Sequence, residues 1–192
     1  TSAWASRTTQ MAGITLPIQH THAEAMVTEK MPKVLNNGIE LADFYETIFG
    51  KQKAVAIGVH PQNHGTLDIS ESVTKTNLLH KGVCAWGVTS MAKELIKLLP
   101  IMEKVRIVRS WGRPTSWTPD EQPLIGWVPG IDNLFVATCL VETITSVPVI
   151  SEWIAMMFQR KDPPVSLEIF SPSRYSHLVG NNELGAMITS DS

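Results

Sequence analysis

The sequence predicts an α+β domain, or mixed α/β fold, in which helices pack on an antiparallel or mixed sheet. Residues 22–29 alternate between apolar and polar side chains, which is typical of a half-buried strand. Residues 54–59 form a continuous apolar run, which favours a strand covered on both faces. Residues 87–99 carry apolar side chains at helical spacing and stop before Pro100, so they predict an amphipathic helix.

The remaining elements follow the same patterns in weaker form. Residues 66–72 are polar and are expected to lead into a helix. Pro148 is expected in the first turn of a second helix, where proline is tolerated because its missing N–H is not needed. The other predicted elements are a helix at 3–12, strands at 14–18, 105–111 and 134–138, and the second helix at 149–160.

Composition excludes several classes of function. The chain has 192 residues, 43% of them hydrophobic, which is enough for one domain or two small ones. Its net charge of −2 provides no basic field for nucleic acid. The sequence contains neither a run of about 18 apolar residues nor a secretion signal. Cys84 and Cys139 stand far apart and are expected to be reduced thiols in a cytoplasmic protein.

The histidines do not predict a metal site. His60 and His64 have the spacing of a metal pair on a helix, but Pro61 and Gly65 argue against a helix there. We therefore expect a solvated loop. His20 and His22 fall on one face of a strand and are expected to line it or to lie on the surface.

Three arginines sit in and after the strand predicted at 105–111. If the strand is regular, Arg109 and Arg113 lie on one face and Arg106 on the other. The guanidinium fork matches the two oxygens of a substrate carboxylate. The alternative is a surface ion pair with Asp120 or Glu121.

The sequence does not decide the roles of three tryptophans and of Thr1. Trp111, Trp117 and Trp127 bracket the same turn and fit core packing as well as a lid over a ligand. Thr1 has the residue type of an N-terminal threonine nucleophile, but no amidohydrolase pattern follows it. The glycine-rich phosphate motifs GxGxxG and GxxxxGK[ST] do not occur, so the sequence shows no means of holding a dinucleotide alone.

The order of several motifs resembles the C-terminal half of the FAD-dependent amine and amino-acid oxidoreductases of the D-amino acid oxidase type. The similarity covers most of the chain and is closest to glycine oxidase, the β subunit of heteromeric sarcosine oxidase, and amine or opine dehydrogenases. The motifs are MAGITLPI at 11–18, AMVTE at 25–29, LLPIMEKVRIVRSWG at 98–112, TPDEQPLIG at 118–126, PGIDNLFVAT at 129–138, and the tail at 163–170.

The resemblance implies a two-domain flavoprotein of which this chain supplies one part. Residues 1–104 would form the substrate-domain sheet with flanking helices. Residues 105–160 would give the strand, turn, strand and helix that close a Rossmann-like FAD domain, and residues 161–192 a C-terminal tail. The glycine-rich half would come from an obligatory partner chain that shares FAD, with further subunits in a hetero-oligomer. Thr1 falls inside a family segment, so a natural division or a cut is expected there.

The resemblance also assigns candidate site residues. The substrate side would carry Arg109, Trp111, Arg113 and Thr115; the carboxylate-binding arginine of glycine oxidase falls at Thr115, where Arg113 is a possible substitute. The cofactor side would carry Trp4, Cys139, Leu140, Val141, Glu142, Thr143, Ile144 and Thr145.

The expected flavin loop departs from the family pattern. It is one residue shorter and lacks glycine, Leu140 and Val141 would crowd the ring, and Glu142 would oppose the anion of reduced flavin. Two main hypotheses therefore stay open. One is a chain of an oxidoreductase that oxidises the C–N bond of a small amino acid or secondary amine. The other is a structural subunit with a degraded flavin loop.

Overall fold

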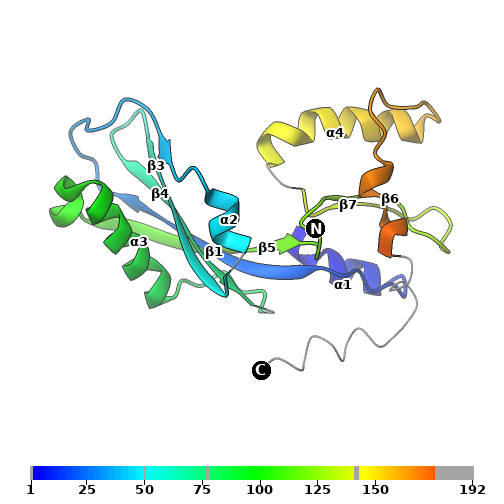
Figure 1. Ribbon diagram of the computed structural model, residues 1–192, viewed down its shortest axis with the longest axis horizontal. Helices are drawn as coiled ribbons and strands as arrows, with labels where there is room; N and C mark the ends of the chain where they lie inside the picture. Colours follow the sequence, from blue (N-terminus) through cyan, green and yellow to red (C-terminus); the bar gives the residue numbers. More distant parts are fainter. Residues whose placement is uncertain (1, 50, 77, 141–142, 176–192) are drawn as a thin grey trace. The chain divides into compact units, whose positions relative to one another are not determined.

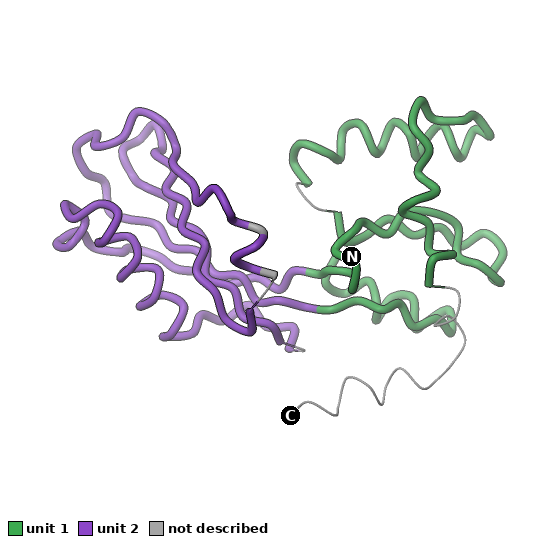
Figure 2. Tube along the Cα trace, in the orientation of Figure 1, with its two compact units in different colours: residues 1–19, 116–192 green, residues 20–115 purple. Residues whose placement is uncertain are grey.

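The computed structural model describes residues 2–49, 51–76, 78–140 and 143–175. The chain divides into two compact units (Figure 2). One consists of residues 20–115; the other combines residues 1–19 with residues 116–192. Thr1 lies outside the described residues. The functional assignment of ranges 1–104, 105–160 and 161–192 stays a prediction.

The unit of residues 20–115 is built on a five-stranded sheet in the order β2-β3-β4-β1-β5 (Figure 1). The β1–β4, β2–β3 and β3–β4 pairs are antiparallel, which confirms the predicted sheet type. The strands are β1 (Gln19–Thr28), β2 (Ile39–Glu40), β3 (Lys53–Pro61), β4 (Leu67–Lys75) and β5 (Ile107–Trp117).

Helices cover both faces of this sheet, as the apolar run at 54–59 predicts (Figure 1). Helix α3 (Ala85–Leu98) buries Met91 and Leu95 against Met26 of β1 and Ile69 of β4. Helix α2 (Phe44–Phe49) lies on the opposite face, where Ile48 packs with small side chains of β1 and β3. A short 3-10 helix, η2 (Pro100–Lys104), connects α3 to β5. Burial of this apolar surface is the main stabilising term of the unit.

The start of α3 is fixed by a carboxylate from the sheet. Cys84 is extended at the N-cap, and its backbone N–H donates to Glu24 Oε1 over 2.6 Å. Ser72 Oγ donates to Glu24 Oε2 over 2.8 Å. A Cβ atom on Gly87 would lie 1.5 Å from Glu24 Oε2, so only glycine fits that turn of the helix. The negative group also complements the positive end of the helix dipole.

The second unit contains a two-stranded antiparallel sheet of β6 (Leu124–Trp127) and β7 (Phe135–Thr138). Its core includes Ile14, Leu16, Leu124, Val136 and Tyr175. The helices of this unit are η1 (Ser2–Trp4), α1 (Ala5–Gln10), α4 (Thr143–Phe158), η3 (Glu168–Phe170) and η4 (Pro172–Tyr175). In the part of the chain that the structure describes, no helix has the length and apolar character to cross a membrane.

Three expected elements differ in the structure. Residues 14–18 are not a strand, although Ile14, Leu16 and Ile18 are buried in the core. Residues 66–72 do not lead into a helix but run into β4, because the polar positions alternate with buried Leu67 and Ile69. Helix α4 begins at Thr143, so Pro148 lies inside the helix rather than in its first turn.

Candidate functional site

A groove of about 550 Å³ opens on the unit of residues 20–115. It is lined by Val27, Gln62, His64, Thr66, Asp68, Val108, Arg109 and Trp111. Val27 and Asp68 are paired across β1 and β4. Their neighbours Met26 and Ile69 are buried against α3, so Val27 and Asp68 face the opposite side of the sheet. The groove therefore occupies the sheet face that α3 does not cover.

The loop between β3 and β4 holds the polar side of the groove. Gln62 Nε2 donates to Asp68 Oδ2 over 2.7 Å. His64 Nε2 and Thr66 Oγ1 are hydrogen bonded at 2.9 Å. The loop is closed by backbone bonds between Gln62 and Thr66 and from Gly65 to Gln62, both 2.9 Å. Gly65 has a φ of +98°, a left-handed conformation that glycine adopts at little cost.

The arginines near this groove have different partners. Arg106 binds Glu29 with Nη2 2.7 Å from Oε2, and Arg113 lies 3.5 Å from Glu71 Oε2. Arg109 lines the groove and has no carboxylate partner among the residues that the structure describes. Burial raises the pKa of Glu71, although the charge of Arg113 opposes that rise. Of these guanidinium groups, only that of Arg109 remains available to an anionic ligand.

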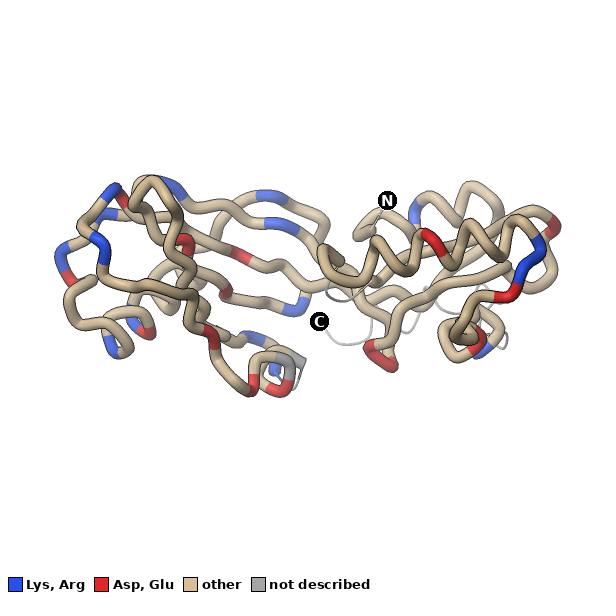
Figure 3. Tube along the Cα trace, turned by 90° about the horizontal axis from the view of Figure 1, so that it is seen from above, with Lys and Arg blue, Asp and Glu red and all other residues tan. Residues whose placement is uncertain are grey.

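The alternative that pairs the arginines with Asp120 or Glu121 is wrong. Asp120 binds Arg174 instead, with Oδ2 2.7 Å from Nε. The sequence could not show this because Arg174 lies far along the chain. Acidic and basic residues are interspersed over both units (Figure 3), in agreement with the small net charge.

The structure brings together two of the predicted substrate-side residues. Trp111 lines the groove beside Arg109 and is 37% exposed. Arg113 and Thr115 do not line it: Arg113 is paired with Glu71, and the hydroxyl of Thr115 is hydrogen bonded to that of Thr21. Both assignments stay predictions.

Sequence reasoning missed the residues of the β3–β4 loop. Gln62, Thr66 and Asp68 gave no separate signal, and His64 was interpreted as part of a solvated loop. His64 does lie in a turn, but that turn borders the groove. The alternation of Leu67, Asp68 and Ile69 was the available signal, because it predicts a strand in which Asp68 lies on the face opposite its two buried neighbours.

The histidine predictions have mixed outcomes. His22 is 3% exposed, so its expected position on a lining or surface is wrong. Its ring stacks on His80 at 3.9 Å, and Nε2 lies 3.4 Å from Glu24 Oε1. His60 Nε2 lies 3.1 Å from Glu40 Oε1. Within the described ranges, no three His, Cys, Asp or Glu side chains are grouped as metal ligands.

The cofactor-side candidates lie in the other unit, around the end of β7. Cys139 is buried and has a φ of +55°, the left-handed conformation usual for glycine. Burial raises the pKa of its thiol. Beside it, the buried hydroxyls of Ser116 and Thr138 have no other hydrogen-bond partner among the described residues. Val141 and Glu142 lie outside the described residues.

The first turn of α4 is open to solvent. Thr143, Ile144 and Thr145 are exposed, and Thr143 Oγ1 donates to Leu140 O over 3.1 Å. Trp4 is half-buried immediately before α1. A helix N-terminus after a left-handed turn suits an anionic group. The cofactor-side assignment of these residues stays a prediction, and the sequence has no glycine-rich loop for the phosphates of FAD.

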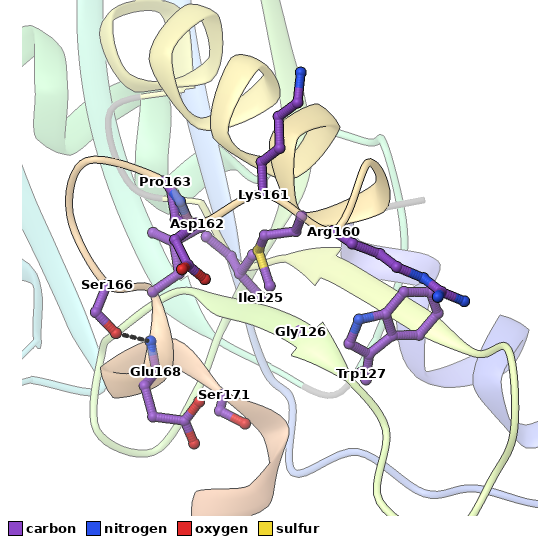
Figure 4. Close-up of a pocket in the computed structure, with 12 residues that line it drawn as sticks. Ile125, Gly126, Trp127, Arg160, Lys161, Asp162, Pro163, Ser166, Glu168 and Ser171 are labelled. Carbon is purple, nitrogen blue, oxygen red and sulfur yellow. Dashed lines mark hydrogen bonds between the residues drawn. The ribbon is translucent and has the colours of Figure 1, made fainter.

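A second hollow of about 660 Å³ lies between β6, the end of α4 and the segment that follows it. In Figure 4, Ile125, Gly126 and Trp127 run along β6, and Ser166 Oγ accepts the N–H of Glu168 over 3.2 Å. Trp127, Phe135 and Phe158 form an aromatic cluster with ring centroids 5.1 Å apart. None of the residues of α4 is buried by the described part of the chain, although the helix is strongly apolar.

Comparison with known proteins decides the family. The model of the DAO family, described as FAD dependent oxidoreductase, matches residues 1–157. The chain belongs to this family. Membership confirms the resemblance that the motifs predicted.

The chain matches part of longer relatives. Hydrogen cyanide synthase subunit HcnC of Pseudomonas protegens is 25% identical over 132 residues, which are 68% of this chain and 28% of that protein. Mitochondrial sarcosine dehydrogenase of Mus musculus is 26% identical over 134 residues, 69% of this chain and 14% of that protein. The chain therefore spans less than a third of these curated relatives.

Solved structures of oxidoreductases share the fold. Glycine oxidase from Geobacillus kaustophilus has a TM-score of 0.76 and 23% identity, and the match covers 91% of this chain and 44% of that one. L-proline dehydrogenase from P. horikoshii has a TM-score of 0.76 and 18% identity, with 92% and 46% covered. At these identities the likeness shows the fold alone, and it confirms the predicted mixed α/β architecture.

Proposed function

We propose that the chain is one component of an FAD-dependent oxidoreductase that oxidises the C–N bond of a small amino acid or secondary amine. The observation that carries the proposal is the groove in which the unpaired guanidinium of Arg109 stands beside Trp111. In a chain of this oxidoreductase family, a free arginine next to an aromatic wall is suited to orient a carboxylate substrate.

In this proposal, FAD and the side chains of this chain have separate roles in the reaction. Bound FAD would supply the hydride acceptor, and this chain would position the substrate. Arg109 would hold the carboxylate, and Trp111 would cover the hydrocarbon part and limit water. The left-handed turn at Cys139 and the exposed first turn of α4 would hold one edge of the ring. Arg113 and Thr115 remain proposed substrate-side residues of lesser weight, because both already have partners.

We further propose an obligatory partner chain that carries the glycine-rich FAD-binding half. Two observations support it: the sequence has no glycine-rich phosphate loop, and none of the residues of α4 is fully buried by the described part of the chain. Further subunits would make the assembly a hetero-oligomer. The free thiols of Cys84 and Cys139 support a reducing compartment, and we propose a cytoplasmic location.

The second candidate is a structural subunit without flavin chemistry. The observation that favours it is the side chain at Cys139, where the backbone has a glycine-like conformation but the glycine is absent. A Cβ atom at that turn reduces the space for a ring, and a non-glycine residue held there carries strain of about 1–3 kcal/mol.

The visible absorbance of the purified complex separates the two candidates. The oxidoreductase predicts a flavin band that bleaches when an amino acid is added without oxygen. Arg109→Gln should keep the band and slow the bleaching, whereas Arg106→Gln, a surface control, should leave the rate unchanged. A colourless complex of defined stoichiometry would overturn the oxidoreductase and support the structural subunit.

A further inference from the structure

We propose that Asn37 is a site of self-catalysed deamidation, in which the imidazole of His60 acts as the general base. Asn37 and Gly38 form the only Asn-Gly dipeptide of the sequence. In such a dipeptide the backbone nitrogen of the glycine can attack the side-chain amide of the asparagine. The site lies away from the groove at Arg109 and does not depend on the proposed oxidation.

The backbone at Asn37 and Gly38 leaves room for that attack. Both residues are exposed and lie immediately before β2, outside any helix or strand. Gly38 has no Cβ atom to shield its nitrogen. In the described part of the chain, the N–H of Gly38 donates to no backbone carbonyl. This nitrogen is therefore open both to loss of its proton and to ring closure.

His60 lies directly against this stretch of backbone. Glu40 pairs with Gly58 in the antiparallel ladder of β2 and β3. In the same register, Gly38 and His60 stand opposite each other. A Cβ atom on Gly38 would lie 2.9 Å from His60 Nδ1, which is closer than a side chain tolerates. The glycine is therefore what lets the ring approach the reacting nitrogen.

Glu40 holds the imidazole in the orientation that the reaction needs. Its Oε1 lies 3.1 Å from His60 Nε2, at the end of the ring opposite Gly38. A carboxylate that accepts the N–H of one ring nitrogen leaves the other nitrogen as a proton acceptor. Gly58 adds to the space for the ring, because a Cβ atom there would lie 3.1 Å from Nε2. Glu40 is thus a positioning residue that acts through His60.

The reaction is a ring closure followed by hydrolysis. His60 Nδ1 removes the proton of the Gly38 N–H, and the nitrogen attacks Cγ of Asn37. The new C–N bond closes a succinimide ring, and the bond from Cγ to the side-chain nitrogen breaks. That nitrogen takes up the proton and leaves as ammonia. The side chain of His60 is 38% exposed, so water can enter and open the ring at either carbonyl. The product is an aspartate or an isoaspartate at position 37.

The modification changes the edge of the sheet. It adds a carboxylate beside Glu40 on β2, the last strand of the sheet on that side. An isoaspartate also adds a methylene group to the main chain just before β2. Since β2 has only two residues with which to hold its register on β3, the longer connection weakens their pairing.

The test follows the peptide that contains Asn37 by mass spectrometry while the full chain is incubated at neutral pH. Conversion of the amide to the acid should accumulate at Asn37 in the folded chain. His60→Gln should slow it by about tenfold or more, because a positioned general base commonly contributes at least that factor. His20→Gln removes a histidine of β1 instead and should leave the rate unchanged. Circular dichroism establishes that each variant is folded.

Two comparisons separate catalysis from a change in the fold. In urea, the wild type and His60→Gln should deamidate at the same rate, because the ring is no longer held against Gly38. Glu40→Gln should slow the folded wild type but add nothing to His60→Gln, whereas additive effects would overturn its positioning role. Equal rates for the folded wild type and His60→Gln, or an unchanged Asn37 in the folded chain, would overturn the proposal.

Discussion

Glu24 and Cys84 join the sheet to the start of α3: the backbone N–H of Cys84 donates to Glu24 Oε1 over 2.6 Å. Glu24 is 2% exposed, so the bond is shielded from water. Hydrogen bonds to a buried charge are stronger than neutral ones, and a carboxylate is favoured at a helix N-terminus. This one side chain therefore fixes where α3 begins and how it meets β1.

We expect Glu24→Gln to lower the free energy of unfolding by about 1.5–3 kcal/mol, because the amide loses the charge-assisted bonds. The measurement is urea denaturation followed by circular dichroism. Glu94→Gln is the control, since Glu94 forms an exposed ion pair with Lys97 and should change stability by less than about 0.5 kcal/mol. Equal effects of the two variants would refute this role for Glu24.

Gly87→Ala is expected to destabilise the protein by about 2 kcal/mol or more, although alanine favours helices. The added Cβ would lie 1.5 Å from Glu24 Oε2 and 2.5 Å from Ser72 Oγ, and both atoms are held by hydrogen bonds. Gly82→Ala is the matched control, because the nearest atom, His80 Nδ1, would lie at 3.5 Å. Adding Glu24→Ala should relieve part of the loss, and purely additive effects would contradict a direct clash.

Glu71 makes the stability of the folded protein depend on pH. Burial raises its pKa above 4.5 in the folded state, with Arg113 opposing the rise. The folded state thus holds the proton more tightly than the unfolded chain. This contribution to stability is present below pH 4.5 and is lost as the pH rises through the raised pKa. Relative to Glu71→Gln, the wild-type urea midpoint should fall across that window; parallel curves for the two proteins would show that the group does not contribute.

Asp120 makes the stability of the fold depend on pH in the opposite direction. Burial alone would raise its pKa, but hydrogen bonds from Arg174 and Thr118 hold it below its usual 3.8. Its contribution is present above pH 3.8 and is lost as the pH falls through the lowered pKa. Arg174→Gln should therefore unfold at a higher pH during acid titration. It should also lose about 1–3 kcal/mol at neutral pH, because Arg174 donates to three backbone carbonyls as well. An unchanged acid transition would contradict the assignment.

Much of the sheet unit could be predicted from local pattern. The strand at 22–29 and the helix at 87–99 were correct because burial on one face imposes a period that the sequence displays. The segment at 66–72 was misjudged because most of its side chains are polar, which obscured the buried positions of Leu67 and Ile69. Pro148 was misplaced for another reason: the apolar signal of α4 is strong on every side, so it does not mark where the helix begins.

The site was less predictable than the fold. Arg109 and Trp111 could be selected because the motif around them resembles the substrate side of the family. Asp68 and Gln62 could not, because their proximity to Arg109 depends on how β4, β1 and β5 are ordered in the sheet. The same applies to ion pairs: Arg174 reaches Asp120 across more than fifty residues of sequence, a separation at which charge patterns carry no information.

The exposed apolar side chains of α4, among them Ile144, Val149 and Phe158, have a consequence for the amount of protein in the cell. A helix of that composition, left in water, attracts chaperones, proteases and other copies of itself. Chains made in excess of whatever covers α4 should be degraded or should aggregate, and synthesis of the two components would then need to be matched. The amount of this polypeptide in the cell would in that case depend on the supply of the proposed partner chain.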